Sequence, residues 1–336
     1  NMKTKPGTFV VIGSGSWGTA LAILLSTNQH EVQLWGNNPE QLEVMQQKRQ
    51  NSFFLKGIDF PENLMICNDL EKVLKTASNV LIAVPSEAIH EVTAKIKPWI
   101  SKNISIISAT KGLYEGEQCF VHEIIANTLG AITSNIAVIS GPTFATEVAM
   151  GLPTAVSIAA EKIETAQQIA RFFHSERFRT YTCQDIIGVQ VGGAVKNVLA
   201  IASGIADGLG FGANTRAAII TRGLNEMLLL GVKLGGKKDT FMGLSGFGDL
   251  VLTCTDNQSR NRRLGIALAQ GDDLKTATAK IGQAVEGIRT AKTVHHLAQS
   301  LGIEMPISTQ TYQVLYQNKK PKDAVNDLLS REPKTE

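Results

Sequence analysis

The sequence predicts a doubly wound α/β domain with a mostly parallel sheet, followed by an all-α domain. Three observations lead to this prediction. A glycine-rich turn joins a short apolar strand to a helix within Thr8–Leu25. Strand candidates then alternate with helical patterns as far as Tyr181, which is typical of a parallel sheet. Beyond that point we find helical periodicity only, so we place the boundary near Asp185–Gly188, with domains of residues 1–187 and 188–336.

The first element is an apolar strand over Phe9–Ile12, followed by Gly13, Gly15 and Gly18 and then by an apolar helix through Ala20–Leu25. The first glycine turns the chain, the second lets the backbone approach a pyrophosphate, and the third allows close packing of helix and strand. The free N–H groups at the start of the helix favour a phosphate there. This order of strand, glycines and helix predicts a dinucleotide site in a Rossmann-like domain. The alternative is a tight turn without a ligand.

The second strand, His30–Trp35, ends in Gly36, Asn37 and Asn38. An acid near this end would bind the ribose 2′-hydroxyl of NAD, and an arginine would accommodate the 2′-phosphate of NADP. Neither is present, so the sequence does not distinguish NAD from NADP, and use of both is plausible.

The remaining elements follow the same alternation. Strands are expected at Met65–Cys67, Asn79–Val84, Ile104–Ser108, Ile136–Ser140, Thr154–Ala159 and Phe178–Tyr181, and helices at Glu40–Gln50, Leu70–Lys75, Glu87–Lys95, Val121–Leu129 and Ile163–Phe173. Ser86 is expected to cap its helix, and Phe53–Leu55 is read as an aromatic loop of unknown role. Ligands bind at the carboxyl ends of parallel strands. We therefore expect one crevice to be formed by Gly13–Gly18, Val84–Ser86, Thr110–Gly112 and Gly141–Thr143.

In the second domain, helices are expected from Ile186 onward and at Leu264–Gln270, Gly282–Ser300 and Ser308–Gln317, with a glycine-rich loop at Gly235–Gly248. The run Ile186–Ala206 is apolar but contains Lys196. A lysine in the middle of a bilayer costs roughly 2.5–3.5 kcal/mol. We therefore predict no membrane span and a cytoplasmic protein.

Composition limits the partners. Of 336 residues, 43% are hydrophobic and 19% charged, and the net charge is +3. This mild basic balance suits anionic small molecules and does not indicate a nucleic-acid partner. The histidines show no ligand spacing, so we predict no metal. The cysteines are Cys67, Cys119, Cys183 and Cys254. They are widely separated in the sequence, so we expect free thiols in a reducing compartment.

Lys196 is the most informative single residue, because it is the only charged residue in its apolar run. Small residues share its helical face and leave room for a ligand or for a closely packed neighbour; they are Gly192, Gly193, Ala200 and Ser203. A desolvated lysine is readily tuned as an acid or base. The alternative is a structural lysine paired with a carboxylate.

Four further positions or stretches are candidates. Lys111 follows a strand end, where it can stabilise a phosphate or carbonyl oxygen or simply be exposed. Asp249 can cap a helix or pair with a lysine. In Ser259–Arg263 a serine cap, a helix start and arginines suit an anion; Arg260 and Asn261 are the better candidates, whereas Arg262 and Arg263 are expected to be solvated. Glu286, next to Gly287, is a weaker candidate.

Taken together, these stretches resemble the prokaryotic NAD(P)-dependent sn-glycerol-3-phosphate dehydrogenases over nearly the whole chain. The matching motifs are GSGSWGTA (Gly13–Ala20), LWGNNP (Leu34–Pro39), AVPS (Ala83–Ser86), TKGL (Thr110–Leu113), GPTFATEV (Gly141–Val148), VGGAVKNVLAI (Val191–Ile201), GLSGFGDLVLTC (Gly243–Cys254), SRNRRLG (Ser259–Gly265) and VEG (Val285–Gly287).

The resemblance implies reversible hydride transfer between NAD(P)H and dihydroxyacetone phosphate, giving glycerol 3-phosphate for phospholipid synthesis. It implies that Lys196 transfers the proton and that Lys111 contacts substrate and cofactor. It further implies substrate contacts at Gly141, Thr143, Asp249, Ser259, Arg260 and Asn261, and cofactor contacts at Ser16, Trp17, Ala145, Arg260 and Glu286. Asn37 departs from the family pattern, because members of this family commonly carry a basic side chain or a histidine at this position. The oligomeric state stays open, with a homodimer as one option.

Two other functions remain as alternatives. A related dehydrogenase acting on a 3-hydroxy acid or a ketopantoate-like substrate would also use a helix lysine, but it would have little use for Arg260 at a helix start. A nucleotide-sensing protein without turnover would keep Gly13–Gly18 but would need no isolated buried lysine.

Overall fold

The computed structural model describes residues 6–115, 120–133 and 135–332. Of the residues discussed above, Cys119 lies outside this part of the chain. The fold divides into two compact units, one ending at Ile186 and the other beginning at Ile187. Each unit is described by itself.

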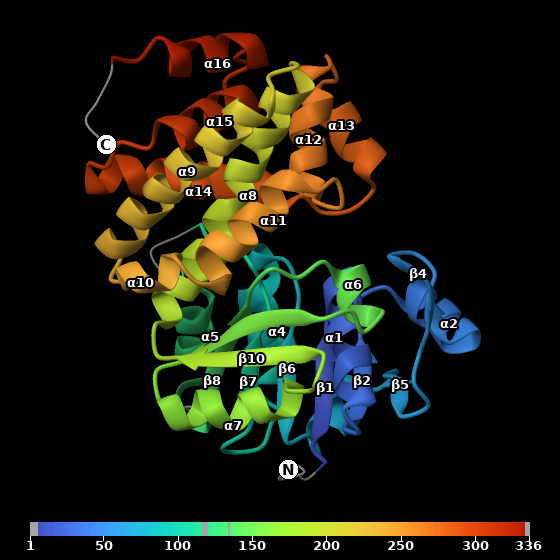
Figure 1. The fold of residues 1–336 in the computed structure, drawn as a ribbon. Helices are drawn as coiled ribbons and strands as arrows, with labels where there is room; N and C mark the ends of the chain where they lie inside the picture. Colours follow the sequence, from blue (N-terminus) through green and yellow to red (C-terminus); the bar gives the residue numbers. More distant parts are fainter. Residues whose placement is uncertain (1–5, 116–119, 134, 333–336) are drawn as a thin grey trace. The chain divides into compact units, whose positions relative to one another are not determined.

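An eight-stranded sheet forms the centre of the first unit (Figure 1). Its strands, in spatial order, are β10 (Phe178–Cys183), β9 (Thr154–Ala160), β8 (Ile136–Ser140), β7 (Ser105–Ser108), β6 (Asn79–Ile82), β1 (Thr8–Ile12), β2 (Glu31–Trp35) and β5 (Leu64–Ile66). Strand β1 pairs in parallel with both β2 and β6. The chain order therefore reverses direction between β1 and β6, and this is the point at which a doubly wound sheet binds its ligand.

Two details of the strands differ from expectation. Strand β9 pairs antiparallel with β8, and the connection between them contains the short α6 (Ala145–Ala149). A small hairpin of β3 (Gln50–Asn51) and β4 (Leu55–Asp59) begins where the expected helix over Glu40–Gln50 should end, and Phe53 and Phe54 lie in the turn between its strands. It follows α2 (Pro39–Lys48).

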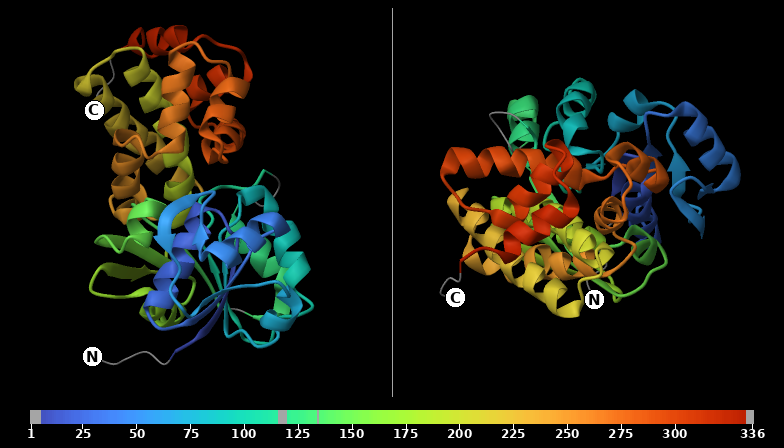
Figure 2. Two further views of the ribbon diagram at one scale, coloured as in Figure 1. Left: turned by 90° about the vertical axis from the view of Figure 1, so that its right-hand side faces the viewer. Right: turned by 90° about the horizontal axis from the view of Figure 1, so that it is seen from above.

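Helices cover both faces of the sheet (Figure 2). The buried side chains of α1 (Ser16–Thr27) and α7 (Ile163–Phe173) pack in one apolar core. Those of α3 (Leu70–Leu74), α4 (Ile89–Ile96) and α5 (Val121–Leu129) pack in a second core. The expected cap at Ser86 is wrong, because this residue begins a 3₁₀ turn, η1 (Ser86–Ala88), and α4 starts only after it. A second such turn is η2 (Gly130–Ile132).

The second unit, in the part of the chain that the structure describes, is built from helices: α8 (Ile186–Gly208), α9 (Ala213–Lys233), α10 (Lys238–Phe241), α11 (Asp249–Thr255), α12 (Arg260–Ala269), α13 (Leu274–Ile281), α14 (Glu286–Leu301), α15 (Pro306–Tyr316) and α16 (Pro321–Leu329). Helix α8 is long and apolar enough to cross a membrane, but 89% of its apolar window is buried in the structure. It is therefore placed as the core helix of this unit.

The glycine-rich stretch Gly235–Gly248 is not a plain loop, as the sequence suggested. It contains α10 and a π-helical turn, η3 (Leu244–Gly248), which runs directly into α11. A Cβ atom on Gly246 would lie 2.2 Å from the carbonyl oxygen of Phe241. The glycines therefore permit a compact helical turn in which larger side chains would clash.

Candidate active site

The glycine turn after β1 has the geometry expected of a phosphate-binding loop. Gly13 has φ of +119°, and a Cβ there would lie 2.3 Å from the carbonyl oxygen of Ala83 on the neighbouring strand end. A Cβ on Gly18 would lie 1.8 Å from the carbonyl oxygen of Gly13. Around Gly15, in contrast, a Cβ would meet no atom within 4 Å. Gly13 and Gly18 are thus needed for packing, and Gly15 leaves the start of α1 open to a ligand.

The hairpin holds this turn in place. Buried Asn51 donates from its amide to the carbonyl oxygen of Ser14 at 2.9 Å, and Gln41 of α2 donates to the same oxygen at 2.9 Å. Sequence analysis did not find Asn51, because its partner lies 37 residues earlier in the chain and no local pattern connects the two.

The structure brings several strand ends together, as the sequence predicted. The indole of Trp17 donates to the carbonyl oxygen of Ala109 at 3.1 Å, and the Thr110 hydroxyl donates to that of Val84 at 2.8 Å. The start of α1 and the ends of β6 and β7 are therefore joined by side-chain hydrogen bonds around the reversal point of the sheet.

Lys111 lies at this junction. Its Nζ donates to the carbonyl oxygen of Gly141 and to the hydroxyl of Thr143, both at 2.7 Å, and lies 5.4 Å from the centre of the Trp17 ring. The side chain is half-buried. An ammonium group held in this way places a fixed positive charge at the carboxyl edge of the sheet, where it can stabilise an anion or a carbonyl oxygen.

In the helical unit, Lys196 of α8 forms an ion pair with Asp249, the first residue of α11. The Nζ–Oδ1 distance is 2.6 Å, and the two side chains are 8% and 1% exposed. Thr253, one turn along α11, accepts a hydrogen bond from Lys196 at 3.2 Å and donates to the Asp249 backbone oxygen at 2.6 Å. Of the two roles left open for Asp249, the lysine partner is therefore observed; the cap position belongs to Gly248, without a side-chain hydrogen bond.

The small residues on the Lys196 face serve close packing. A Cβ on Gly192 would lie 2.4 Å from the carbonyl oxygen of Ser245 in η3, and the Ser203 hydroxyl donates to the carbonyl oxygen of Cys254 at 2.8 Å. Helix α8 can thus approach η3 and α11 closely enough for the ion pair to form. Thr253 was missed by sequence analysis, although its position four residues after Asp249 places both on one helical face.

The start of α12 confirms the serine cap. The Ser259 hydroxyl accepts the backbone N–H of Arg262 at 3.1 Å. The Asn261 amide donates to the Asn197 side chain of α8 at 3.0 Å and accepts the N–H of Gly287 at 2.9 Å. Asn261 therefore fixes α12 to α8 and to the start of α14.

Arg260 is half-buried, and its guanidinium donates to the Gln283 side chain at 3.2 Å. Burial lowers the pKa of Arg260, while the negative charge of Glu286 raises it. Glu286 itself is half-buried at the first position of α14. A guanidinium, an acid and a capped helix start are therefore close together in the helical unit.

The expected solvation of Arg262 is wrong. Its side chain is buried, forms an ion pair with Asp207 of α8, and donates to Asn257 at 3.1 Å and to the carbonyl oxygen of Cys254 at 3.2 Å. A buried arginine requires such partners. Arg263, which was also expected to be solvated, is exposed.

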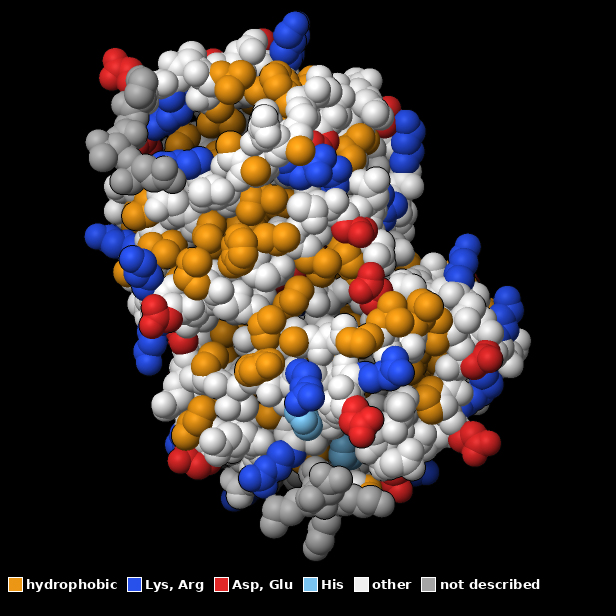
Figure 3. Space-filling view, viewed as in Figure 1, with side chains coloured by type: hydrophobic (Ala, Val, Ile, Leu, Met, Phe, Trp, Pro, Cys, Tyr) orange, Lys and Arg blue, Asp and Glu red, His pale blue; other side chains and the backbone are white. Residues whose placement is uncertain are grey.

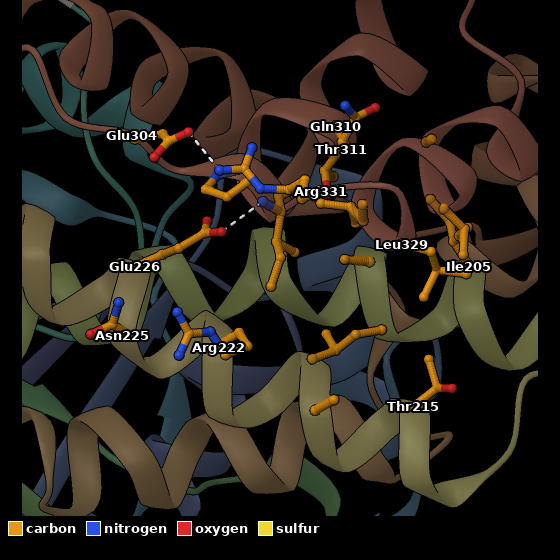
Figure 4. Close-up of a pocket in the computed structure, with 18 of the residues that line it drawn as sticks. Ile205, Thr215, Arg222, Asn225, Glu226, Glu304, Gln310, Thr311, Leu329 and Arg331 are labelled. Carbon is orange, nitrogen blue, oxygen red and sulfur yellow. Dashed lines mark hydrogen bonds and ion pairs between the residues drawn. The ribbon is translucent and has the colours of Figure 1, made fainter. Parts of the chain in front are cut away.

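A separate cavity of about 860 Å³ lies in the helical unit between α8, α9, α15 and α16 (Figure 4). Its walls are largely apolar, and Glu226 lies at its edge. The Glu226 carboxylate accepts the backbone N–H of Ile307 at 2.6 Å and that of Ser308 at 3.0 Å, so it caps the start of α15. Burial raises the pKa of Glu226 to about 7. None of the site residues predicted from the sequence lines this cavity.

The fold and the site define a class of protein. A dinucleotide-binding turn lies at the reversal point of a doubly wound sheet, and an all-α unit carries a buried lysine with a carboxylate partner. These are the features of a nicotinamide-dependent dehydrogenase with a helical second domain. In the described residues we find no group of three side chains that could hold a metal ion.

The comparisons with known proteins identify the family. The descriptions "NAD-dependent glycerol-3-phosphate dehydrogenase N-terminus" and "C-terminus" match residues 8–166 and 185–326. Glycerol-3-phosphate dehydrogenase [NAD(P)+] of Bartonella tribocorum is 51% identical over 100% of both chains, and that of Shewanella sp. strain MR-4 is 52% identical over 97% of this chain and 96% of the relative. The crystal structure of glycerol-3-phosphate dehydrogenase from Coxiella burnetii matches with a TM-score of 0.93 and 47% identity, covering 97% of this chain and 99% of the other.

The chain therefore belongs to the NAD-dependent glycerol-3-phosphate dehydrogenase family. It is an NAD(P)-dependent oxidoreductase of lipid metabolism, as the sequence motifs predicted. The alternatives of a ketopantoate-like reductase and of a sensor without turnover are set aside by this membership.

Proposed function

We propose that Lys196 is the general acid that protonates the carbonyl oxygen of dihydroxyacetone phosphate during its reduction to sn-glycerol 3-phosphate, and the base in the reverse direction. The ion pair with Asp249 at 2.6 Å carries this proposal. A positioned acid or base accelerates proton transfer by about 10²–10⁴-fold. The buried carboxylate fixes the ammonium group, and Thr253 limits its orientation.

The residues at the sheet edge would hold the cofactor. The open backbone at Gly15 and the start of α1 fit a pyrophosphate, with Gly13 and Gly18 shaping the turn. We propose further contacts from Ser16, Trp17, Asn37, Lys111, Ala145, Arg260 and Glu286. When bound, the nicotinamide supplies the hydride that reduces the carbonyl carbon.

We propose that Arg260 and the α12 start bind the substrate phosphate, because a guanidinium and a helix N-terminus both favour a phosphate. Ser259 and Asn261 set the direction of this helix start. Lys111, with Gly141 and Thr143, would add positive charge and polar contacts for the substrate. A fixed phosphate sets where the carbonyl group lies, which is the benefit of orientation in catalysis.

We further propose that the enzyme works in the cytoplasm and that its product supplies phospholipid synthesis.

Self-association as a homodimer is proposed through the helical unit, because α9 exposes Leu229 and Val232 by 43% and 45% and apolar side chains gather on the face of this unit seen in Figure 3. Sedimentation of the wild type and of Leu229→Glu tests this: a dimer that Leu229→Glu dissociates supports it, and a monomeric wild type refutes it.

One assay tests the proposed substrate recognition. Oxidation of NADH and of NADPH is measured with dihydroxyacetone phosphate and, separately, with unphosphorylated dihydroxyacetone. The proposal predicts rapid turnover only with the phosphorylated ketone. Equal kcat/KM values for the two ketones would contradict a phosphate site at Arg260.

A further inference from the structure

A cavity of about 580 Å³ opens at the carboxyl end of β2. The cavity is lined by Trp35, Gly36 and Asn37 at the end of β2, by Glu43 of α2 and by Lys95 of α4. In a doubly wound dinucleotide domain, the end of the second strand is where the ribose of the adenosine half is recognised. The strand end itself carries neither an acid nor an arginine for this purpose.

Lys95 supplies a positive charge to this cavity from a different element. Its Nζ lies 4.5 Å from the centre of the Trp35 ring, a favourable cation–π arrangement that holds the ammonium group beside the strand end. In the part of the chain that the structure describes, Lys95 forms no ion pair with a carboxylate. Its hydrogen-bond donors therefore remain available to an anion.

Glu43 introduces the opposite charge into the same cavity. Its carboxylate accepts a hydrogen bond from Gln47 at 3.2 Å on the exposed side of α2. The remaining polar lining residues, Asn37, Gln46 and Asn68, are neutral. The charge of the cavity is thus set by one lysine and one glutamate, neither of which belongs to β2.

We propose that Lys95 is a specificity-determining residue that binds the 2′-phosphate of NADP, and that Glu43 weakens this binding by repulsion. Sequence analysis did not find this role of Lys95, because the residue lies 60 positions after Trp35 at the end of β2. Use of both cofactors follows from two opposed charges: the lysine makes the 2′-phosphate acceptable, and the glutamate keeps the preference small.

The test uses the two adenosine fragments of the cofactors rather than turnover. Binding of adenosine 2′,5′-bisphosphate and of adenosine 5′-monophosphate to the full chain is measured by calorimetry. Lys95→Gln should weaken binding of the bisphosphate about tenfold, the equivalent of ~1.4 kcal/mol, and leave binding of the monophosphate unchanged. Glu43→Gln should strengthen binding of the bisphosphate severalfold.

Lys97→Gln is the matched control, because Lys97 is exposed at the end of the same helix and does not line the cavity. It should leave both affinities unchanged. The proposal is overturned if Lys95→Gln weakens both ligands equally, if it weakens neither, or if Lys97→Gln has the same effect as Lys95→Gln. Because the readout is fragment binding, it is independent of the proposed role of Lys196.

Discussion

The buried ion pair between Lys196 and Asp249 allows a quantitative test by substitution. Asp249→Asn keeps the size of the side chain and removes only its charge. Since the Lys196 side chain is 8% exposed and the Asp249 side chain 1% exposed, solvent cannot replace the lost partner. Removing one member of a buried pair is destabilising by about 3–5 kcal/mol, because it leaves the other charge uncompensated.

Replacing both charges gives a different expectation. The double variant Lys196→Met/Asp249→Leu removes the buried charges together, and apolar replacement of a buried pair is often neutral or stabilising. The free energies of unfolding should therefore be strongly non-additive, with a coupling of at least ~3 kcal/mol.

The assay is urea unfolding followed by far-ultraviolet circular dichroism, applied to the wild type, Asp249→Asn, Asp249→Leu, Lys196→Met and the double variant; the coupling is calculated from the last three and the wild type. Activity is measured in parallel, and the double variant should be stable but inactive. Additive effects, or an Asp249→Asn variant as stable as the wild type, would show that the two groups do not interact in a low-dielectric environment.

Three further predictions concern the glycine turn, Arg260 and Glu226. Gly18→Ala should destabilise the first unit, since its Cβ would lie 1.8 Å from a carbonyl oxygen, whereas Gly15→Ala should fold normally and lose NADH affinity. Thermal unfolding and NADH titration distinguish the two variants, and a stable Gly18→Ala variant would refute the packing argument. Arg260→Ala should raise KM for dihydroxyacetone phosphate by the equivalent of about 1.5–3 kcal/mol, and unchanged kinetics would remove Arg260 from the site. Burial raises the pKa of Glu226 to about 7 in the folded state, so the folded state binds the proton more tightly than the unfolded chain does. The free energy of unfolding of the wild type, relative to that of Glu226→Gln, should therefore fall by about 3 kcal/mol between pH 4.5 and 7.5. A difference between the two proteins that is independent of pH in urea unfolding would contradict this.

The features that the sequence predicts well are local. The strand, glycines and helix from Thr8 to Thr27 form one continuous pattern, and β8, α5 and α7 have the predicted bounds. Lys196 was conspicuous because a charge in an apolar helix is expensive unless it is paired. In these cases, the physical cause and the sequence signal occupy the same stretch of chain.

The features that the sequence did not predict depend on distant partners. Arg262 and Asp207 are 55 residues apart, and only the packing of α12 against α8 turns a basic helix start into a buried ion pair. Asn51 stabilises the glycine turn from a hairpin that has no clear strand pattern. The antiparallel pairing of β9 with β8 similarly has no signal in the β9 sequence itself.

The central claim is that the Lys196 ammonium group delivers the proton. It is tested most directly by the single-turnover rate of Lys196→Ala with dihydroxyacetone phosphate, with and without added methylamine, alongside the NADH affinity of the same variant. We expect the rate to fall about 10²–10⁴-fold, the NADH affinity to change little, and methylammonium to restore part of the rate. A folded Lys196→Ala variant that binds NADH and turns over within a few fold of the wild-type rate would contradict the mechanism.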